Sequence, residues 1–432
     1  MLKISTFCCA LLLAAALQAQ INPVPAGPQT APILILGATA HLGNGQVIAN
    51  SAIAFENGKI TLVADATTIR LDRSKYAKIY DASGKQVYPG FIGMDTRLGL
   101  VEIDAVRATV DFAEAGAYNS NARAIVAYNT DSDLLPTVRS NGVLLAQITP
   151  QGGALSGASS VVQLDAWNWE DATYKADEGQ HLNWPAMRSW GGWETGNPEM
   201  KKNEQYDKDI AALHKFFQEA AAYAAGPAPT VSNPRFEAMR GLFSKAQTLY
   251  IHTDAARSIQ DAVVFAQKFN FKIVLVGASD AWRVADFLKA NNVAVILGRT
   301  QRLPSRDDED YDQPYKTAKM LHDKGVVFSF SDEGAWRQRN VPFQAGQAVG
   351  HGLPKEAAVQ ALCLNAATIL GIQDRAGTIE TGKDANLFIS EGDALDMRGN
   401  IVTAAFIQGR ELQLDDKHKQ LYQRYSQKKS RM

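Results

Sequence analysis

Cysteine is scarce in this sequence, and neither sign of charge is in excess. Of the three cysteines, Cys8 and Cys9 lie near the N-terminus and only Cys363 remains in the body of the chain. A single thiol excludes an internal disulfide framework, and its apolar surroundings in AVQALCLNA are typical of a buried core residue. With 45 acidic and 44 basic side chains, the protein has no net field that would recruit nucleic acid or an anionic membrane. We therefore expect its partners to be small molecules, peptides or other proteins.

Long apolar runs are also lacking. No segment approaches the roughly 20 consecutive apolar residues that a membrane-spanning helix needs, so we expect no membrane span. A shorter apolar stretch, from Ile4 to Leu17, follows Lys3 and precedes the sequence QAQ. This order of charged, apolar and small residues is that of a secretory signal peptide. The sequence therefore predicts that residues 1–20 are removed and that the mature protein is secreted or periplasmic.

Strand-like patterns occupy both ends of the remaining chain, and a repeating strand and helix pattern lies between them. Short strands broken by Asn-Gly turns cover residues 21–88 and 376–414, which predicts a small β-sandwich domain formed from both chain ends. Residues 89–375 alternate buried strands such as FKIVLVGASD with helices such as SIQDAVVFAQKFN. This alternation predicts an α/β fold with an eight-fold (β/α) barrel. Residues 415–432 are a basic polar tail.

An aromatic-rich insertion, residues 165–239, interrupts the barrel pattern. It contains five tryptophans, a strongly helical piece and a Pro-rich exit. Two interpretations stay open for it. Long excursions from a barrel often serve as a lid or an interface, and tryptophans also form satellite packing clusters.

Three segments carry a resemblance to a known family, and the first of them, ILGATAHLGNGQVIANSAIAFENGKI, residues 35–60, matches its opening strands. QVYPGFIGMDTRLGL, residues 86–100, resembles the first barrel strand of the amidohydrolase superfamily, in the imidazolonepropionase-like and Xaa-Pro-dipeptidase-like branch, whose strand reads PGFID-x-H-x-H. Residues 358–389, AVQALCLNAATILGIQDRAGTIETGKDANLFI, are similar to the closing segment of the same family. The resemblance implies a (β/α)8 TIM-like barrel with a small β-sandwich domain. It also implies a hydrolase of carbon–nitrogen bonds that uses a divalent metal, zinc.

The family's metal-ligand motif is degenerate in this chain. The two histidines of the first strand are replaced by Asp95 and Arg97, and the histidine that ends the sixth strand is replaced by Gly277. His252 and Asp332 match the ligands that end the fifth and eighth strands. In the family the aspartate also takes the proton from the attacking water. No ligand of the fourth strand is assigned. The remaining histidines match no ligand position and are left without a role: His41, His181, His214, His322, His351 and His418.

Arg97 argues against a family-like metal site. A guanidinium is permanently protonated and has no lone pair to offer a metal. Strands 1 and 8 are neighbours in a closed barrel, so one hypothesis places an ion pair between Arg97 and Asp332 in the space of the metal. It predicts no stoichiometric zinc, and recovery of binding when histidine is restored at positions 95, 97 and 277.

A second hypothesis keeps a metal in an altered, oxygen-rich site. Asp95, His252 and Asp332, with Asp280 just beyond the sixth strand, offer carboxylate and imidazole ligands that several divalent ions accept. Two function classes follow. One is an exported amidohydrolase with weak or altered activity on a cyclic amide or small peptide. The other is a pseudoenzyme that binds a ligand, forms a homo-oligomer or pairs with an active paralogue.

Overall fold

The computed structural model describes residues 24–191, 199–227, 230–304, 306 and 308–429. The expected signal peptide, residues 1–20, lies outside these described residues. Within them, no helix has both the length and the apolar character required to cross a bilayer.

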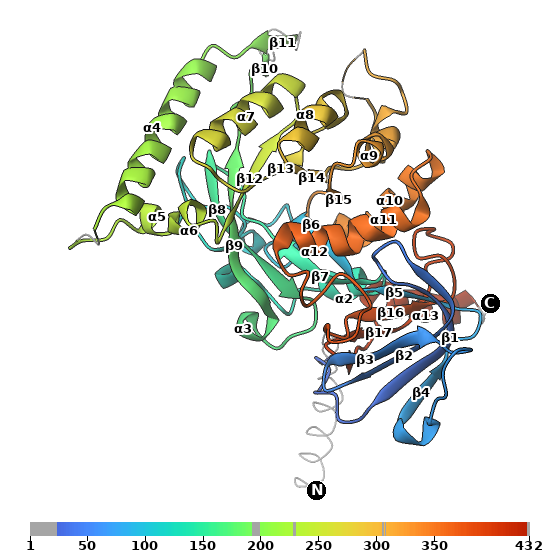
Figure 1. The fold of residues 1–432 in the computed structure, drawn as a ribbon. Helices are drawn as coiled ribbons and strands as arrows, with labels where there is room; N and C mark the ends of the chain where they lie inside the picture. The colour runs from blue at the N-terminus through green and yellow to red at the C-terminus, as the bar shows by residue number, and fades with distance from the viewer. Residues whose placement is uncertain (1–23, 192–198, 228–229, 305, 307, 430–432) are drawn as a thin grey trace, which may run out of the picture.

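The central unit is an eight-stranded sheet that curls into a nearly closed barrel (Figure 1). Its strands, in chain and spatial order, are β6 (Phe91–Thr96), β7 (Val143–Ile148), β8 (Leu155–Gln163), β9 (Thr173–Asn183), β12 (Thr248–Thr253), β13 (Ile273–Gly277), β14 (Ala294–Leu297) and β15 (Phe328–Phe330). β15 returns beside β6 without a hydrogen-bonded ladder between them. The expected mixed α/β barrel is confirmed in this form.

One barrel strand runs against the others. β8 is antiparallel to both β7 and β9, whereas the remaining neighbours are parallel. The strand and helix alternation of the sequence predicts parallel strands throughout, which is wrong for β8. The short connection of residues 149–154 explains the difference, because a tight loop can join antiparallel strands but a parallel pair needs a long crossover. β9 also falls inside the segment that the sequence analysis treated as an insertion.

Helices cover the outside of the barrel, and α7, α8 and α9 lie along β12 to β14 (Figure 1). Apolar residues of α7, such as Ile259 and Val263, pack with strand residues such as Leu275 in one large core cluster. The helices are α2 (Leu134–Arg139), α3 (Trp169–Ala172), α4 (Tyr206–Ala225), α5 (Pro234–Glu237), α6 (Arg240–Phe243), α7 (Ala256–Lys268), α8 (Ala285–Ala290), α9 (Gln313–Asp323), α10 (Val341–Gly350), α11 (Lys355–Gln360), α12 (Ala366–Leu370) and α13 (Lys417–Lys429).

The second large sheet draws strands from both ends of the chain. It joins β1 (Ile33–His41), β2 (Val47–Glu56), β3 (Lys59–Asp65), β4 (Lys78–Asp81), β5 (Gln86–Pro89), β16 (Leu387–Ser390), β17 (Val402–Ile407) and β18 (Arg410–Glu411). Hydrogen bonds connect these strands into one continuous sheet, so the expected β-sandwich is not confirmed. A small hairpin of β10 (Arg188–Gly191) and β11 (Glu199–Lys202) completes the strands of the described residues.

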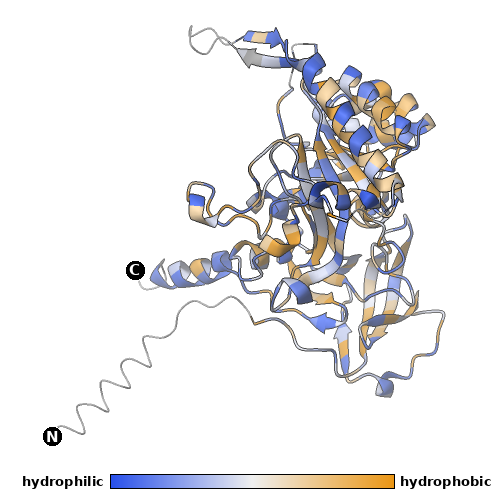
Figure 2. Cartoon of the chain, turned by 90° about the vertical axis from the view of Figure 1, so that its left-hand side faces the viewer, coloured by the Kyte–Doolittle hydropathy of each residue, from blue (hydrophilic) through white to orange (hydrophobic). Residues whose placement is uncertain are grey.

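The interior of the barrel is apolar at one end and polar at the other. Met94, Leu145 and Val274 belong to an interior cluster that α12 closes through Ile369 and Leu370. The polar end is the carboxyl end of the parallel strands, where barrels of this kind keep their sites. In contrast, α13 in the expected polar tail projects from the body and is mostly hydrophilic (Figure 2).

Candidate metal and ligand site

Asp95 stands at an irregularity near the end of the first barrel strand. Ile92 and Met94 of β6 belong to the interior cluster, and regular alternation would turn the next residue outward. The backbone of Asp95 is instead left-handed, with φ +48°, and the pairing of β6 with β7 shifts register between Gly93 and Thr96. This bulge brings the carboxylate to the barrel mouth, where the side chain is 7% exposed.

Two histidines on neighbouring strands lie close to this carboxylate. His181 is on β9 and His252 is on β12, and His181 Nδ1 lies 2.9 Å from His252 Nε2. His252 Nε2 lies 4.0 Å from Asp95 Oδ1, and one ligand atom from each of the three residues lies within 4.8 Å of the others. Burial, together with the nearby charge of His252, lowers the pKa of His181 well below 6.5. The His181 ring is therefore neutral at physiological pH and keeps a lone pair.

A buried polar network holds Asp95 and His181 in place. The His181 ring stacks on Tyr250 with ring centroids 4.7 Å apart. The Tyr250 hydroxyl and Gln147 Nε2 each donate to the Glu178 carboxylate at 2.7 Å. Gln147 Oε1 accepts from the backbone N–H of Asp95 at 3.1 Å. Because burial dominates over these donors, the pKa of Glu178 is raised.

The cluster opens onto a cavity of about 1190 Å³ at the carboxyl ends of the barrel strands. Asp95 and His252 line this cavity together with Arg97, Trp184 and Arg337. A space of this size accommodates a small molecule or a short peptide. The mouth of the barrel therefore combines a cluster of ligand atoms with room for a substrate.

The donor set of Asp95, His181 and His252 fits a divalent cation. Asp95 Oδ1 is buried and has no hydrogen-bond partner among the described residues, and an uncompensated carboxylate oxygen is costly to bury. A cation between the carboxylate and the two imidazoles would compensate it. Two imidazoles and one carboxylate are also the ligands of known catalytic zinc sites, which leave a position open for water or substrate.

Asp332 is outside this cluster, and the ion pair expected between Arg97 and Asp332 does not form. Asp332 Oδ1 lies 3.2 Å from Arg299 Nε and 3.6 Å from Arg337 Nε. Its Oδ2 accepts from Gln344 Nε2 at 3.0 Å. Burial raises the pKa of Asp332, although the two arginines and Gln344 oppose the shift. The carboxylate thus finds its positive partners on the loops after β14 and β15, not on β6.

The Arg97 side chain contacts Phe112 and Asp104 and not the expected Asp332. Its guanidinium lies 4.6 Å from the centroid of the Phe112 ring, and Arg97 Nη1 is 4.0 Å from Asp104 Oδ1. In the described part of the chain, no ion pair joins Arg97 to Asp95. The bulge at Asp95 gives the reason, because it breaks the alternation that would place residues 95 and 97 side by side on one face of the strand.

The remaining expected positions do not contribute ligands. Gly277 ends β13 with φ +82°, and a Cβ there would lie 3.0 Å from Asp254 Oδ1. Asp280 accepts from the two terminal nitrogens of Arg306 at 2.9 and 2.8 Å. It also accepts from the N–H of Ala256 at the start of α7. Of the oxygen-rich set proposed from the sequence, only Asp95 and His252 come together.

The sequence gives no sign that His181 is a candidate ligand or that a polar network lies beneath it. β9 reads TYKADEGQHLN and contains few of the apolar residues that mark a buried barrel strand. Its polar residues are nevertheless inside, and Glu178, Gln180 and His181 are all at most 2% exposed. When the buried side chains of a strand are polar and hydrogen-bonded, its sequence shows no apolar pattern that would reveal the burial. The tryptophans on either side of it strengthened the impression of an insertion.

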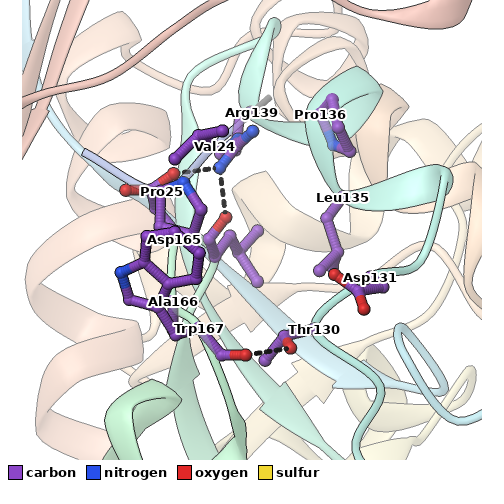
Figure 3. A pocket seen from close by; sticks show the side chains of 11 residues that line it. Val24, Pro25, Thr130, Asp131, Leu135, Pro136, Arg139, Asp165, Ala166 and Trp167 are labelled. Carbon is purple, nitrogen blue, oxygen red and sulfur yellow. Dashed lines mark hydrogen bonds and ion pairs between the residues drawn. The ribbon is translucent and has the colours of Figure 1, made fainter. Parts of the chain in front are cut away.

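A second, smaller cavity of about 100 Å³ lies away from the barrel mouth (Figure 3). Val24 and Pro25 line one side of it, next to the buried ion pair of Arg139 with Asp165. Asp165 Oδ2 also accepts from the N–H of Ala26 at 2.9 Å. These contacts fasten the start of the described chain to the barrel. Among the described residues, none that lines this cavity belongs to a cluster of metal-ligating side chains.

Comparisons with known sequences find similarity to amidohydrolases. The sequence model of the amidohydrolase family matches residues 313–412. The amidohydrolase tasK of Hapsidospora irregularis is 23% identical over 391 residues, which are 79% of this chain and 38% of that protein. The chain thus spans well under half the length of this relative.

Solved structures share the fold at low sequence identity. An amidohydrolase from Thermotoga maritima MSB8 aligns with 88% of this chain and 99% of its own, with a TM-score of 0.74 and 20% identity. A Xaa-Pro dipeptidase with bound methionine covers 89% of this chain and 100% of its own, with a TM-score of 0.56 and 13% identity. An adenosine deaminase from Xanthomonas campestris with bound zinc covers 94% and 99%, with a TM-score of 0.53 and 16% identity.

Proposed function

Since the chain belongs to the amidohydrolase superfamily, we propose that it is a metal-dependent hydrolase of carbon–nitrogen bonds in small amides or dipeptides. Its metal site would combine His252, which matches a ligand of the family, with Asp95 and His181, which are not ligands in the family motif. The observation that carries the proposal is the convergence of these three residues within 4.8 Å at the mouth of a large cavity.

Each group of the site has a separate task. A divalent cation, for which we propose zinc, supplies Lewis-acid chemistry: it polarises a carbonyl and makes water a nucleophile near neutral pH. Asp95 and the two histidines would hold this ion. Tyr250 and Gln147 keep their partners in position through stacking and hydrogen bonds. Asp332 forms an ion pair with Arg299 and accepts a hydrogen bond from Gln344. We therefore do not assign it the proton transfer that the matching aspartate performs in the family.

Metal analysis and a substrate screen test the proposal. We expect one equivalent of metal in protein dialysed against zinc or manganese, and hydrolysis of at least one class among dipeptides, N-acyl amino acids and lactams. Asp95→Asn should lose both the metal and the turnover. Asparagine tolerates the left-handed backbone of this position, so the variant should fold. Asp374→Asn, at an exposed carboxylate outside the cavity wall, is the matched control. Metal-free protein after zinc loading would overturn the proposal.

One observation favours a second candidate, a non-catalytic relative. Two arginines neutralise Asp332, the residue that in the family touches the metal and moves the proton. Such a protein would bind a ligand in the same cavity or pair with an active homologous barrel. Stoichiometric metal without turnover, together with co-purification of a second barrel protein, would select this candidate over the enzyme.

Export is a separate part of the proposal. The charged, apolar and small-residue order of residues 1–20 supports a secreted or periplasmic protein. Intact-mass measurement of protein recovered from its native source should show a chain that begins after Gln20. A full-length mass, with Met1 retained, would contradict export by cleavage.

A further inference from the structure

Two arginines flank Gly334 at the barrel mouth. A Cβ built on Gly334 would lie 3.3 Å from Arg97 Nη2 and 3.9 Å from Arg337 Nη2. Both side chains line the same cavity as Asp95 and His252. Placing two permanent positive charges around one point is unfavourable unless an anion lies between or beside them.

Neither guanidinium has its charge fully used by the protein. Arg97 has one long contact, 4.0 Å from Nη1 to the carboxylate of Asp104, whose side chain is 79% exposed. Its Nε is buried without a hydrogen-bond partner among the described residues. Arg337 uses Nε alone, which donates to the Glu333 carbonyl at 3.0 Å and lies 3.6 Å from Asp332. In the described part of the chain, the terminal nitrogens of Arg337 donate no hydrogen bond, and the one hydrogen bond of this side chain is the one from Nε.

The surroundings hold the Arg97 guanidinium and Gly334 in position before any ligand arrives. The Arg97 guanidinium lies over the Phe112 ring, which restricts its motion. The Thr96 hydroxyl donates to the Gly334 carbonyl at 2.7 Å, so the loop that carries Gly334 is fixed to the strand that carries Arg97. Gly334 has φ +93°, a conformation that favours glycine and leaves the space beside the arginines open.

We propose that Arg97 and Arg337 form an anion-binding subsite that takes the carboxylate of the substrate. The planar fork of a guanidinium matches a carboxylate with two parallel hydrogen bonds. The identity of the ligand as a substrate rests on the proposed function, whereas the binding itself does not. The subsite narrows the substrate class to amides with a free carboxylate, such as N-acyl amino acids or dipeptides, and gives Arg97 a binding role.

Equilibrium binding of three probes tests the subsite without requiring turnover. Calorimetry with N-acetylglycine, N-acetylglycinamide and inorganic phosphate, each with and without a chelator, should show that the acid binds at least about tenfold more tightly than the amide. Arg97→Gln and Arg337→Gln should each weaken the acid by roughly 10- to 100-fold, as expected for hydrogen bonds to a charged group. Arg398→Gln, at an 88% exposed arginine outside the cavity, should leave it unchanged.

Several results would overturn the subsite. Equal binding of the acid and the amide by the unaltered protein would do so even if the arginine variants failed to fold. So would phosphate binding more tightly than the acid, or acid binding that disappears with the chelator and persists in both glutamine variants. These outcomes differ from a failure of the proposed function. Protein that lacks metal and turnover but binds the acid through both arginines keeps the subsite and removes the hydrolase.

Discussion

His181 and His252 lie on neighbouring barrel strands with their imidazole nitrogens Nδ1 and Nε2 only 2.9 Å apart. Burial keeps His181 neutral, so the two rings do not repel each other as two cations and His181 retains a lone pair. Asp95 Oδ1 completes the arrangement 4.0 Å from His252 Nε2. The histidine that the family motif does not contain is therefore the one that makes a three-ligand site possible.

The first prediction concerns the contribution of His181 to metal affinity. His181→Asn removes one of three ligands, so the zinc dissociation constant should rise by at least about 100-fold, the upper range for loss of a supporting group. Competition with a chromophoric chelator measures it. His322→Asn, in α9 and outside the cavity wall, should leave the zinc dissociation constant unchanged. Unchanged affinity in His181→Asn would remove this residue from the site.

The second prediction concerns the network behind the ligands. Tyr250→Phe preserves the stacking on His181 but removes the donor to Glu178, leaving a buried carboxylate oxygen without that partner. The free energy of unfolding should fall by about 1–3 kcal/mol, measured from the urea midpoint. Tyr422→Phe, at a 75% exposed tyrosine, is the control and should have no effect. Equal midpoints for the two variants would show that the Glu178 network does not stabilise the fold.

The sequence predicted the outline of the fold better than its site. The family resemblance is confirmed. The strands β12 and β13 were recognised because burial on both faces leaves a continuous apolar run, and the helix α7 because burial on one face leaves a helical period. β9 left no such pattern, since its buried side chains are polar and bond to groups on other strands and loops. The sequence therefore could not reveal His181 as a ligand.

Backbone conformation was the other obstacle. An alignment places residues 95 and 97 as alternate strand positions, but the left-handed φ of Asp95 separates their side chains. The partner of Asp332 was misjudged for a related reason: neighbouring strands 1 and 8 suggested Arg97, whereas Arg299 and Arg337 reach Asp332 from loops. Loop geometry is not encoded in strand order.

The third prediction revises the idea that histidine at position 277 would restore the site. Gly277 has φ +82°, so Gly277→His should cost roughly 1–3 kcal/mol of stability through backbone strain and should not increase zinc affinity. Gly277→Ala should show the same loss of stability, which separates strain from side-chain size. Tighter zinc binding by the histidine variant would contradict this expectation.

The fourth prediction concerns acid stability. Burial alone would raise the pKa of Asp384, but hydrogen bonds from Lys59 and Tyr174 outweigh it and hold that pKa below 3.8. A carboxylate with a lowered pKa stabilises the fold above its unfolded pKa and loses this contribution as the pH falls through the folded value. The melting temperature should therefore drop more between pH 5 and pH 3, values chosen to bracket about 3.9, in the unaltered protein than in Asp384→Asn. An equal drop in melting temperature for the two proteins between these pH values would contradict the prediction.

The fifth prediction concerns the buried ion pair beside the small cavity. Asp165 is 2% exposed and pairs with Arg139, which is 5% exposed, and with Arg410 at 3.0 Å. Asp165→Asn would leave two buried or half-buried cations without their carboxylate. The free energy of unfolding should therefore fall by about 3–5 kcal/mol.

The pair of Arg123 with Asp177 provides the comparison, because its side chains are 45% and 30% exposed. Asp177→Asn should cost about 0–1 kcal/mol, as is usual for pairs in contact with solvent. Urea titrations of both variants give the difference directly. If the two substitutions cost the same, burial does not set the strength of the Asp165 cluster, and the attachment of Ala26 to Asp165 would contribute little to the stability of the barrel.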